Sequence, residues 1–293
     1  MPRWHVYVNH AAGRRPVDPA LVREILADLG VDAEIFAPES KEETTTLIQQ
    51  AAHAGVRHFV VTGGDGTVNL AVNALMPLSL GRPVLGVLPV GTGCDLVRTF
   101  GLPQDLPGAA RHLTSPDIYD IDVATVEGEW GVRYFANVAQ TGVGAAAAQT
   151  AMRIGRRLGA SRYPLAFVAR LPRFPKAKVK ITTERRTIET EALAVIMANA
   201  QFFAGGWNVA PKATLIDGVL DIQVINCDKT SAPALVPKVI KGTHLGDPAV
   251  RRLSAAEFSI ETDPLWPVEC DGEPVGNTTV RGRVVPAAIS LKI

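Results

Sequence analysis

Strand-like and helix-like patterns alternate at short intervals through residues 1–122. Strands are predicted at residues 4–8, 31–36, 58–62 and 84–88, and helices at residues 18–29, 41–54, 95–100 and 106–113, with one more from a glycine-rich turn to residue 76. Strands that alternate with helices in this way predict an α/β domain with a Rossmann-like sheet.

After residue 122 the pattern changes to many short alternating segments, such as residues 119–128 and 257–262. Short strands of this kind predict a β-sandwich or an open barrel, here interrupted by two helices near residues 145–157 and 162–171. We therefore expect two domains, an α/β domain at residues 1–122 and a mainly β domain at residues 123–293. An alternative is that the final strand returns to the first domain.

Two glycine-rich turns follow neighbouring predicted strands of the first domain. The first turn is Gly63 to Thr67 and the second is Val90 to Asp95, while the first strand of the chain ends in residues 9–14. Glycines allow the backbone to approach phosphate oxygens closely, and the N–H groups of turns and helix starts point at the anion. The three loops predict one phosphate-binding crevice at the carboxyl edge of the sheet. Taken alone, each turn also fits an ordinary strand-to-helix connection.

Composition narrows the classes of partner and site. The formal net charge is +1, so no nucleic-acid partner is expected. The three cysteines, Cys94, Cys227 and Cys270, have no metal-ligand spacing and indicate neither zinc nor a disulfide framework. No run of about 18 apolar residues occurs, so we expect a cytoplasmic protein whose membrane contact, if any, is peripheral at the inner face.

Further blocks accompany the two turns in a fixed order. They are the sequence GGDGT followed by Asn69, then PVGTGCD ending at Asp95, Gly205–Gly206, residues 210–221, and residues 270–273. This series resembles the diacylglycerol kinase catalytic-domain family, which includes bacterial lipid kinases and sphingosine and ceramide kinases and is distantly similar to NAD kinases and phosphofructokinases. The resemblance covers nearly the whole chain. It implies an NAD kinase-like first domain that binds nucleotide and a sandwich-like second domain that binds lipid.

The resemblance also implies residue roles. ATP would be bound by Asn9, Gly13, Arg14, Gly63, Gly64, Asp65, Gly66, Thr67, Asn69, Gly91, Thr92, Gly93 and Asp95. Asp65 would lie beside the phosphates and their Mg²⁺. Asp271 and Glu273 are the candidates to receive the proton of the acceptor hydroxyl, since general base catalysis needs a carboxylate within hydrogen-bond reach. Their alternate positions would place both side chains on one side of an extended segment unless Gly272 forms a turn.

A structural Mg²⁺ is implied by the block at residues 210–221. Thr214, Asp217 and the carbonyl of Val219 would be its protein ligands, and oxygen ligands on a tight loop suit this ion. The alternative is an Asp-Gly turn that opens a strand. The chain departs from the family pattern at Leu70, where the family usually has Glu, and at Cys94, where it usually has Asn. Both changes bear on substrate choice and turnover.

A basic segment, residues 153–186, carries many arginines and lysines against the single acid Glu184. Its interleaved apolar residues indicate a surface that could rest on anionic lipid headgroups. The alternative is a solvated cationic face whose apolar side packs in the core. Family members are often dimeric, which allows a homodimer here.

The sequence thus predicts an ATP-dependent, Mg²⁺-dependent lipid kinase, with diacylglycerol as the first substrate to consider. Two alternatives stay open. One is an NAD kinase or another kinase of soluble metabolites, and the other is a nucleotide- and lipid-binding protein with weak catalysis.

Overall fold

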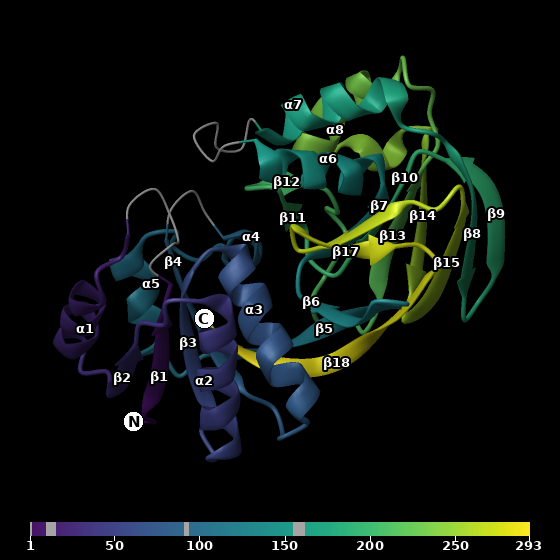
Figure 1. The fold of residues 1–293 in the computed structure, drawn as a ribbon. Coiled ribbons are helices and arrows are strands. Elements are labelled where there is room, and N and C mark those ends of the chain that lie inside the picture. The colour runs from purple at the N-terminus through teal and green to yellow at the C-terminus, as the bar shows by residue number, and fades with distance from the viewer. Residues whose placement is uncertain (1, 10–15, 91–93, 155–161) are drawn as a thin grey trace. The chain divides into compact units, whose positions relative to one another are not determined.

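The structure is a computed structural model that describes residues 2–9, 16–90, 94–154 and 162–293. The chain forms two compact units (Figure 1). The first unit comprises residues 1–122 together with Pro286–Ile293, and the second comprises Val123–Val285. The end of the chain is therefore part of the first unit.

The first unit is built on a parallel sheet in the order β2-β1-β3-β4. Its strands are β1 (Trp4–Val8), β2 (Ala33–Phe36), β3 (His58–Gly63) and β4 (Val84–Pro89). The last part of β18 (Val280–Lys292) extends this sheet, because Ser290 and Leu291 pair in parallel with Val84 and Leu85. Beyond β18 the strands are antiparallel, so the sheet as a whole is mixed.

Helices cover both faces of the first sheet (Figure 1). They are α1 (Pro19–Asp28), α2 (Lys41–His53), α3 (Asp65–Leu75), α4 (Asp95–Thr99) and α5 (Leu106–His112), with a short 3-10 turn η1 (Met76–Leu78). Val22 and Leu26 of α1 and Ala110 of α5 pack with Val6 and Val60 in one buried cluster. Val6 and Val60 alternate along their strands with Tyr7 and Val61, which are also buried, so the sheet is apolar on both faces.

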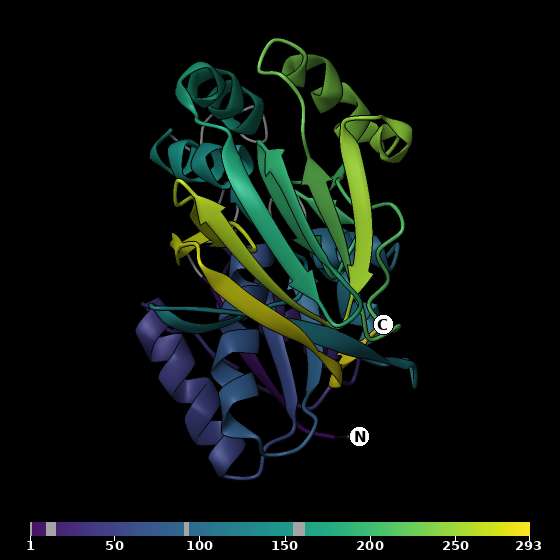
Figure 2. The same cartoon turned by 90° about the vertical axis from the view of Figure 1, so that its right-hand side faces the viewer.

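The second unit contains two groups of mostly antiparallel strands (Figure 2). One group is a sheet in the order β14-β13-β10-β7-β16-β17, with β7 (Val138–Gly142), β10 (Ala194–Ala198), β13 (Leu220–Ile225), β14 (Val250–Ala255), β16 (Pro267–Cys270) and β17 (Glu273–Asn277). The other group has β5 (Ile118–Gly128), β6 (Gly131–Phe135), β8 (Ala177–Thr183), β9 (Thr187–Ala192), β15 (Glu257–Asp263) and the start of β18. Phe135, Ile181, Val195 and Ile222 from both groups share one buried cluster, as in a sandwich.

Three helices lie over the outer face of the β14–β17 sheet, namely α6 (Val143–Arg153), α7 (Arg162–Arg170) and α8 (Ala232–Lys241) (Figures 1 and 2). Short 3-10 turns, η3 (Leu171–Arg173) and η4 (His244–Gly246), and a small ribbon, β11 (Phe202–Phe203) with β12 (Trp207–Asn208), complete the unit. The predicted fold class, an α/β unit followed by a mainly β, sandwich-like unit, is confirmed.

Candidate functional site

The first glycine-rich turn joins β3 to α3 through a close contact. A Cβ atom on Gly63 would lie 2.2 Å from Oγ1 of Thr67, so only glycine fits at this position. The same Oγ1 atom accepts a hydrogen bond of 2.9 Å from Nδ2 of Asn9, which follows β1. The structure thus brings Asn9, Gly63 and Thr67 together at the carboxyl edge of the parallel sheet, where open α/β sheets bind their ligands.

Asp65 connects the first glycine-rich turn to the second block. Its Oδ1 atom accepts hydrogen bonds from the backbone N–H groups of Asp95 (2.7 Å) and Leu96 (3.4 Å), and Sγ of Cys94 lies 3.4 Å away. The carboxylate therefore satisfies N–H groups at the start of α4, as a capping side chain does. Burial, together with the negative charge of Asp65, raises the pKa of the Cys94 thiol.

The other predicted nucleotide residues divide into two sets. Asn69 and Asp95 are buried, Gly64 is half-buried, and Gly66 is exposed at the start of α3. Leu70, where the chain departs from the family pattern, is half-buried. Asp95 forms an ion pair with Arg98, with 3.6 Å between Oδ1 and Nε. The remaining predicted residues, Gly13, Arg14, Gly91, Thr92 and Gly93, lie outside the described residues.

Asp271 and Gly272 form the two-residue turn of the hairpin between β16 and β17. Both have positive φ angles, 47° and 87°, and Cys270 pairs directly with Glu273 across the hairpin. Such angles are those of a tight hairpin turn, which asparagine, aspartate and glycine adopt best. Asp271 and Glu273 therefore do not lie at alternate positions of one extended segment, because Gly272 turns the chain.

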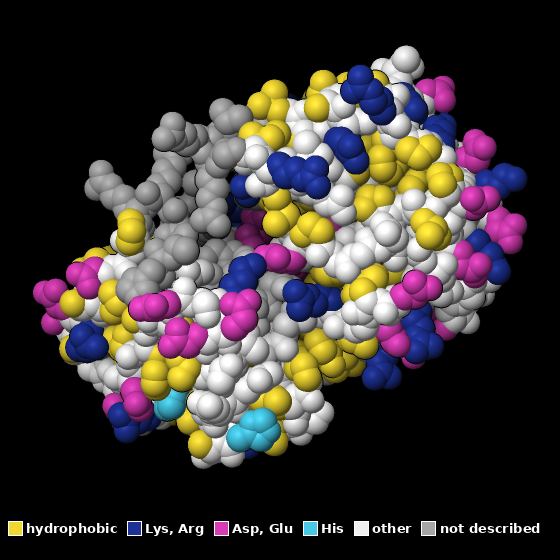
Figure 3. Space-filling model, in the orientation of Figure 1, with side chains coloured by type: hydrophobic (Ala, Val, Ile, Leu, Met, Phe, Trp, Pro, Cys, Tyr) yellow, Lys and Arg dark blue, Asp and Glu magenta, His cyan; other side chains and the backbone are white. Residues whose placement is uncertain are grey.

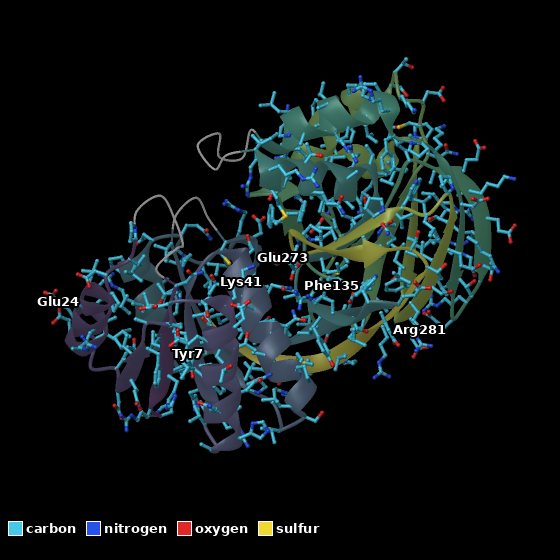
Figure 4. All side chains as sticks on the ribbon, in the orientation of Figure 1. Tyr7, Glu24, Lys41, Phe135, Glu273 and Arg281 are labelled. Carbon is cyan, nitrogen blue, oxygen red and sulfur yellow. The ribbon has the colours of Figure 1, made fainter. Side chains whose placement is uncertain are left out.

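The carboxylate of Asp271 is buried among backbone amides. Oδ1 accepts from the N–H groups of Asn137 (3.0 Å) and Val138 (2.9 Å), and Oδ2 accepts from that of Ala136 (2.9 Å). These bonds attach the hairpin to the start of β7. Glu273 follows at the start of β17 and is half-buried (Figure 4).

A buried pair on β16 and β7 was not predicted from the sequence. Glu269 is fully buried, and its Oε2 atom accepts a hydrogen bond of 2.6 Å from Nε2 of Gln140. Its Oε1 atom accepts from the N–H of Gly272, in the hairpin turn. Burial raises the pKa of Glu269 to about 8. The two residues are 129 positions apart, so the only sequence signal was a polar residue within each of two apolar strands.

A cavity of about 100 Å³ lies between the outer face of the β14–β17 sheet and the three helices. Its walls are mainly apolar and include Ala147 of α6, Phe167 of α7, Leu235 of α8 and Ile196 of β10, while Gln140 contributes an amide. A mainly apolar cavity with a few polar groups is the usual form of a site for an apolar ligand.

The predicted metal loop precedes β13. Asp217 is exposed, and its Oδ1 atom accepts a 3.2 Å hydrogen bond from the N–H of Val219, as in an Asx turn. Thr214 is also exposed on this loop. No group of three or more His, Cys, Asp or Glu side chains that could hold a metal occurs in the described parts of the chain. A carboxylate, a hydroxyl and a carbonyl are nevertheless the kinds of oxygen ligand that Mg²⁺ takes.

The basic segment contains both core and surface residues. Leu171 and Phe174 are buried, whereas Leu165 and Val168 of α7 are 53% and 60% exposed, and Met152 of α6 is 51% exposed. In Figure 3 apolar and basic side chains lie side by side over these helices. In the second half of the basic segment, Lys180 forms an ion pair with Glu261, with 3.4 Å between Nζ and Oε1. Among the residues described, no helix is long and apolar enough to cross a membrane.

Two family models match consecutive parts of the chain. The diacylglycerol kinase catalytic domain matches residues 3–126. The YegS C-terminal NAD kinase beta sandwich-like domain matches residues 137–293. Together the two matches cover most of both structural units, including the glycine-rich turns and the hairpin that carries Asp271.

Similar proteins span nearly the whole chain. A protein named "Diacylglycerol kinase" from Mycobacterium tuberculosis (strain ATCC 25618 / H37Rv) is 29% identical over 287 residues, 97% of this chain and 91% of that protein. A protein named "Probable lipid kinase YegS-like" from Klebsiella pneumoniae (strain 342) is 26% identical over 270 residues, covering 92% of this chain and 89% of its own.

Solved structures show the same fold. A crystal structure of a diacylglycerol kinase from Bacillus anthracis str. Sterne superposes with a TM-score of 0.74 at 23% identity, covering 99% of this chain and 96% of that one. Another structure from the same organism superposes with a TM-score of 0.80 at 25% identity and the same coverage.

Proposed function

Because the chain belongs to the family with a diacylglycerol kinase catalytic domain and a YegS-type C-terminal domain, we propose that it is an ATP-dependent lipid kinase. It transfers the γ-phosphoryl group of ATP to a lipid hydroxyl, and diacylglycerol is the first substrate to test. The observation that carries the proposal is the mainly apolar cavity of the second unit. Such a cavity suits a hydrocarbon chain and does not suit a charged soluble acceptor such as NAD.

In this proposal the carboxyl edge of the first sheet binds ATP. Asn9, Gly63 and Thr67 are held together there, and Asp65 keeps the start of α4 in place. The proposal assigns nucleotide binding to Gly13, Arg14 and Gly91 to Gly93 as well, which lie outside the described residues. Phosphoryl transfer asks mainly for positioning and charge neutralisation, which backbone N–H groups at glycine-rich turns supply.

Mg²⁺ enters the proposal in two places. Bound with ATP, the ion would neutralise charge on the phosphates. Asp65 and Asp95 are the described carboxylates of the glycine-rich blocks that would lie beside it. A structural Mg²⁺ would be held by Thr214, Asp217 and the carbonyl of Val219, and it would order the exposed loop before β13.

The proposed general base is Glu273. The acceptor oxygen forms the new bond to the γ-phosphorus, the bond to the leaving ADP oxygen breaks, and the hydroxyl proton passes to the Glu273 carboxylate. Asp271 was the second candidate for this role. Its three bonds to backbone N–H groups instead favour a positioning role, since they fix the hairpin that carries Glu273.

Access to a lipid in a bilayer requires a contact surface. Met152, Leu165 and Val168 are exposed apolar residues, and Arg153 and Arg170 are exposed beside them in sequence. Exposed apolar side chains flanked by arginines suit peripheral contact with anionic headgroups. We place the protein in the cytoplasm, at the inner membrane face when it is bound.

The decisive experiment is transfer of labelled phosphate from ATP to a panel of lipids in mixed micelles, with Mg²⁺ and with EDTA. The variant Glu273→Gln should lower turnover by at least about 100-fold while ATP still binds. Glu129→Gln, a change at an exposed glutamate in a turn, is the matched control. Label in NAD and in no lipid would favour the soluble-metabolite kinase. ATP binding without any labelled acceptor would favour the binding protein with weak catalysis.

A further inference from the structure

Gln140 brings a buried amide to the wall of the apolar cavity. Its side chain is on β7, and the residue is only 7% exposed. The other polar groups among the described lining residues belong to Tyr163, Trp207 and Cys227, which are mostly aromatic or weakly polar. An amide needs hydrogen-bond partners when it is buried, because an unpaired acceptor away from water costs free energy.

Glu269 fixes which way this amide points. Both oxygens of Glu269 act as acceptors, Oε2 from Nε2 of Gln140 and Oε1 from the N–H of Gly272. In the structure the nitrogen of the Gln140 amide faces Glu269, and its Oε1 atom faces Gly144. The arrangement also connects the cavity, through Glu269 and Gly272, to the hairpin that carries Glu273.

Gly144 leaves open the space beside this oxygen. A Cβ atom at position 144 would lie 2.1 Å from Oε1 of Gln140. Both residues line the cavity. Among the described residues the only hydrogen bond of the Gln140 side chain is the one to Glu269, so Oε1 has no donor within this part of the chain. A ligand that covers this oxygen at the apolar wall must offer it a hydrogen-bond donor, because otherwise the acceptor is buried unpaired.

We propose that Oε1 of Gln140 is a specificity determinant that accepts a hydrogen bond from a donor group of the lipid. This inference rests on the proposed lipid kinase function. The hydroxyl that receives the phosphoryl group has one proton, which passes to Glu273, so the donor must be a second group. A second hydroxyl or an amide N–H has the required chemistry, and an ester or ether oxygen does not. The inference therefore favours such a lipid over diacylglycerol, whose only donor is the hydroxyl that reacts.

The test compares lipids that differ only in this donor. One pair is 1-oleoylglycerol and 1-oleoyl-2-O-methylglycerol, in which the second hydroxyl is blocked. The other pair is a ceramide and its N-methyl derivative, which lacks the amide N–H. We expect the wild-type kcat/KM to favour the donor-bearing member of at least one pair by roughly 10-fold or more, because a site built around a hydrogen bond rejects the analogue that lacks it. The pair that shows the preference identifies the donor.

Two variants connect that preference to Gln140. Gln140→Met removes the acceptor, and Gly144→Ala places a methyl group where Oε1 lies and displaces the end of a flexible side chain. Each should bring the ratio of kcat/KM within the favoured pair close to 1. Ile196→Val, at an apolar lining residue, should keep the wild-type ratio. Gly144→Ala tests the inference even if Gln140→Met does not fold, since it leaves every polar group in the chain.

Three results would overturn the inference. They are a wild-type ratio near 1 for both pairs, an unchanged ratio in folded Gln140→Met, and an unchanged ratio in Gly144→Ala. In each case phosphorylation of some lipid by the wild type would leave the proposed function standing. If the wild type phosphorylates no lipid at all, the proposed function fails first, and the assignment of Gln140 fails with it.

Discussion

At the scale of single residues, two buried carboxyl groups near the hairpin are held in opposite ways. Asp271 accepts three backbone N–H bonds, which suit a charged carboxylate. Glu269 is fully buried, accepts two bonds and lies near Asp271 and Glu273, whose negative charges disfavour a further charge. Desolvation is the largest cause of its raised pKa, which reaches about 8.

This pKa predicts a dependence of stability on pH. The unfolded chain releases the Glu269 proton near pH 4.5, whereas the folded chain keeps it to about pH 8. The contribution of Glu269 to stability is therefore complete below pH 4.5, declines up to about pH 8 and is constant above it. Relative to the wild type, Glu269→Gln should gain roughly 1–4 kcal/mol of unfolding free energy between pH 5 and pH 8.5. Urea unfolding at both pH values measures this gain, and Glu129→Gln should show none.

Asp65 allows its structural and electrostatic roles to be separated. Asp65→Asn keeps an oxygen for the N–H of Asp95, so we expect nearly wild-type thermal stability but turnover lower by about 100-fold or more. Asp65→Ala removes the acceptor and should also lose about 1–2 kcal/mol of unfolding free energy. Calorimetry and the lipid assay together test both variants. Full turnover in Asp65→Asn would show that the charge has no part in the reaction.

These residues also show how far the sequence could predict the site. Gly63, Asp65 and Thr67 belong to one local strand-turn-helix pattern, and the contacts of Gly63 with Thr67 follow from their short spacing. The pair of Gln140 and Glu269 joins strands 129 positions apart and has no local pattern. Pairing of distant strands decides such contacts, and one sequence does not specify it.

At the scale of elements, the hairpin turn between β16 and β17 depends on the backbone conformation of a glycine. Gly272 has a φ angle of 87°, and no atom lies within 4 Å of a Cβ placed there, so Gly272→Ala tests backbone strain alone. We expect a loss of about 1–2 kcal/mol in unfolding free energy and a lower kcat, because the turn holds Glu273. Gly246→Ala is the control, since that glycine has ordinary φ and open surroundings. If the two variants were equally stable, the prediction of backbone strain at position 272 would be wrong.

Helix α8 shows where element prediction from sequence failed. Residues 232–241 contain Pro233 in the first turn and Pro237 inside the helix, and prolines normally end helical patterns. Pro233 lies at a position that tolerates proline, and Pro237 is four residues later, where its missing N–H would have paired with the carbonyl of Pro233. Ala232 and Leu235 are buried against the rest of the second unit, and this packing offsets the hydrogen bond that Pro237 cannot make. Tertiary contacts, which the sequence pattern does not show, decide this helix.

At the scale of the whole molecule, the second unit is an insertion into the first. The chain leaves the first unit after Asp122 and re-enters it at Pro286. Oδ1 of Asp122 accepts a 2.8 Å hydrogen bond from the N–H of Ala287, and Oγ of Ser290 donates to Asp120 at 2.6 Å. The points of exit and return are therefore adjacent within the first unit.

This arrangement predicts how the first unit responds to deletion. Replacing residues 123–285 by a short Gly/Ser linker should leave a folded first unit, because Asp122 and Ala287 are already neighbours. The same shortened protein that also lacks residues 286–293 should be unfolded or aggregated, since Ile289 and Leu291 are buried and Ser290 and Leu291 pair β18 with β4. Circular dichroism melting curves distinguish the two. A cooperative transition in the shorter protein would show that the returning strand is dispensable.

The insertion also sets the order of events during synthesis. The ribosome makes residues 1–122 before residues 123–285, but the strand segment that borders β4 is made only after all of residues 123–285. Domains usually fold from the N-terminus onward as they are made. Here one edge of β4 stays unpaired in the nascent first unit until residues 286–293 are made. The second unit can complete its own core before then. Newly made chains are thus most open to misassembly or chaperone capture at β4, in the interval before residues 286–293 are added.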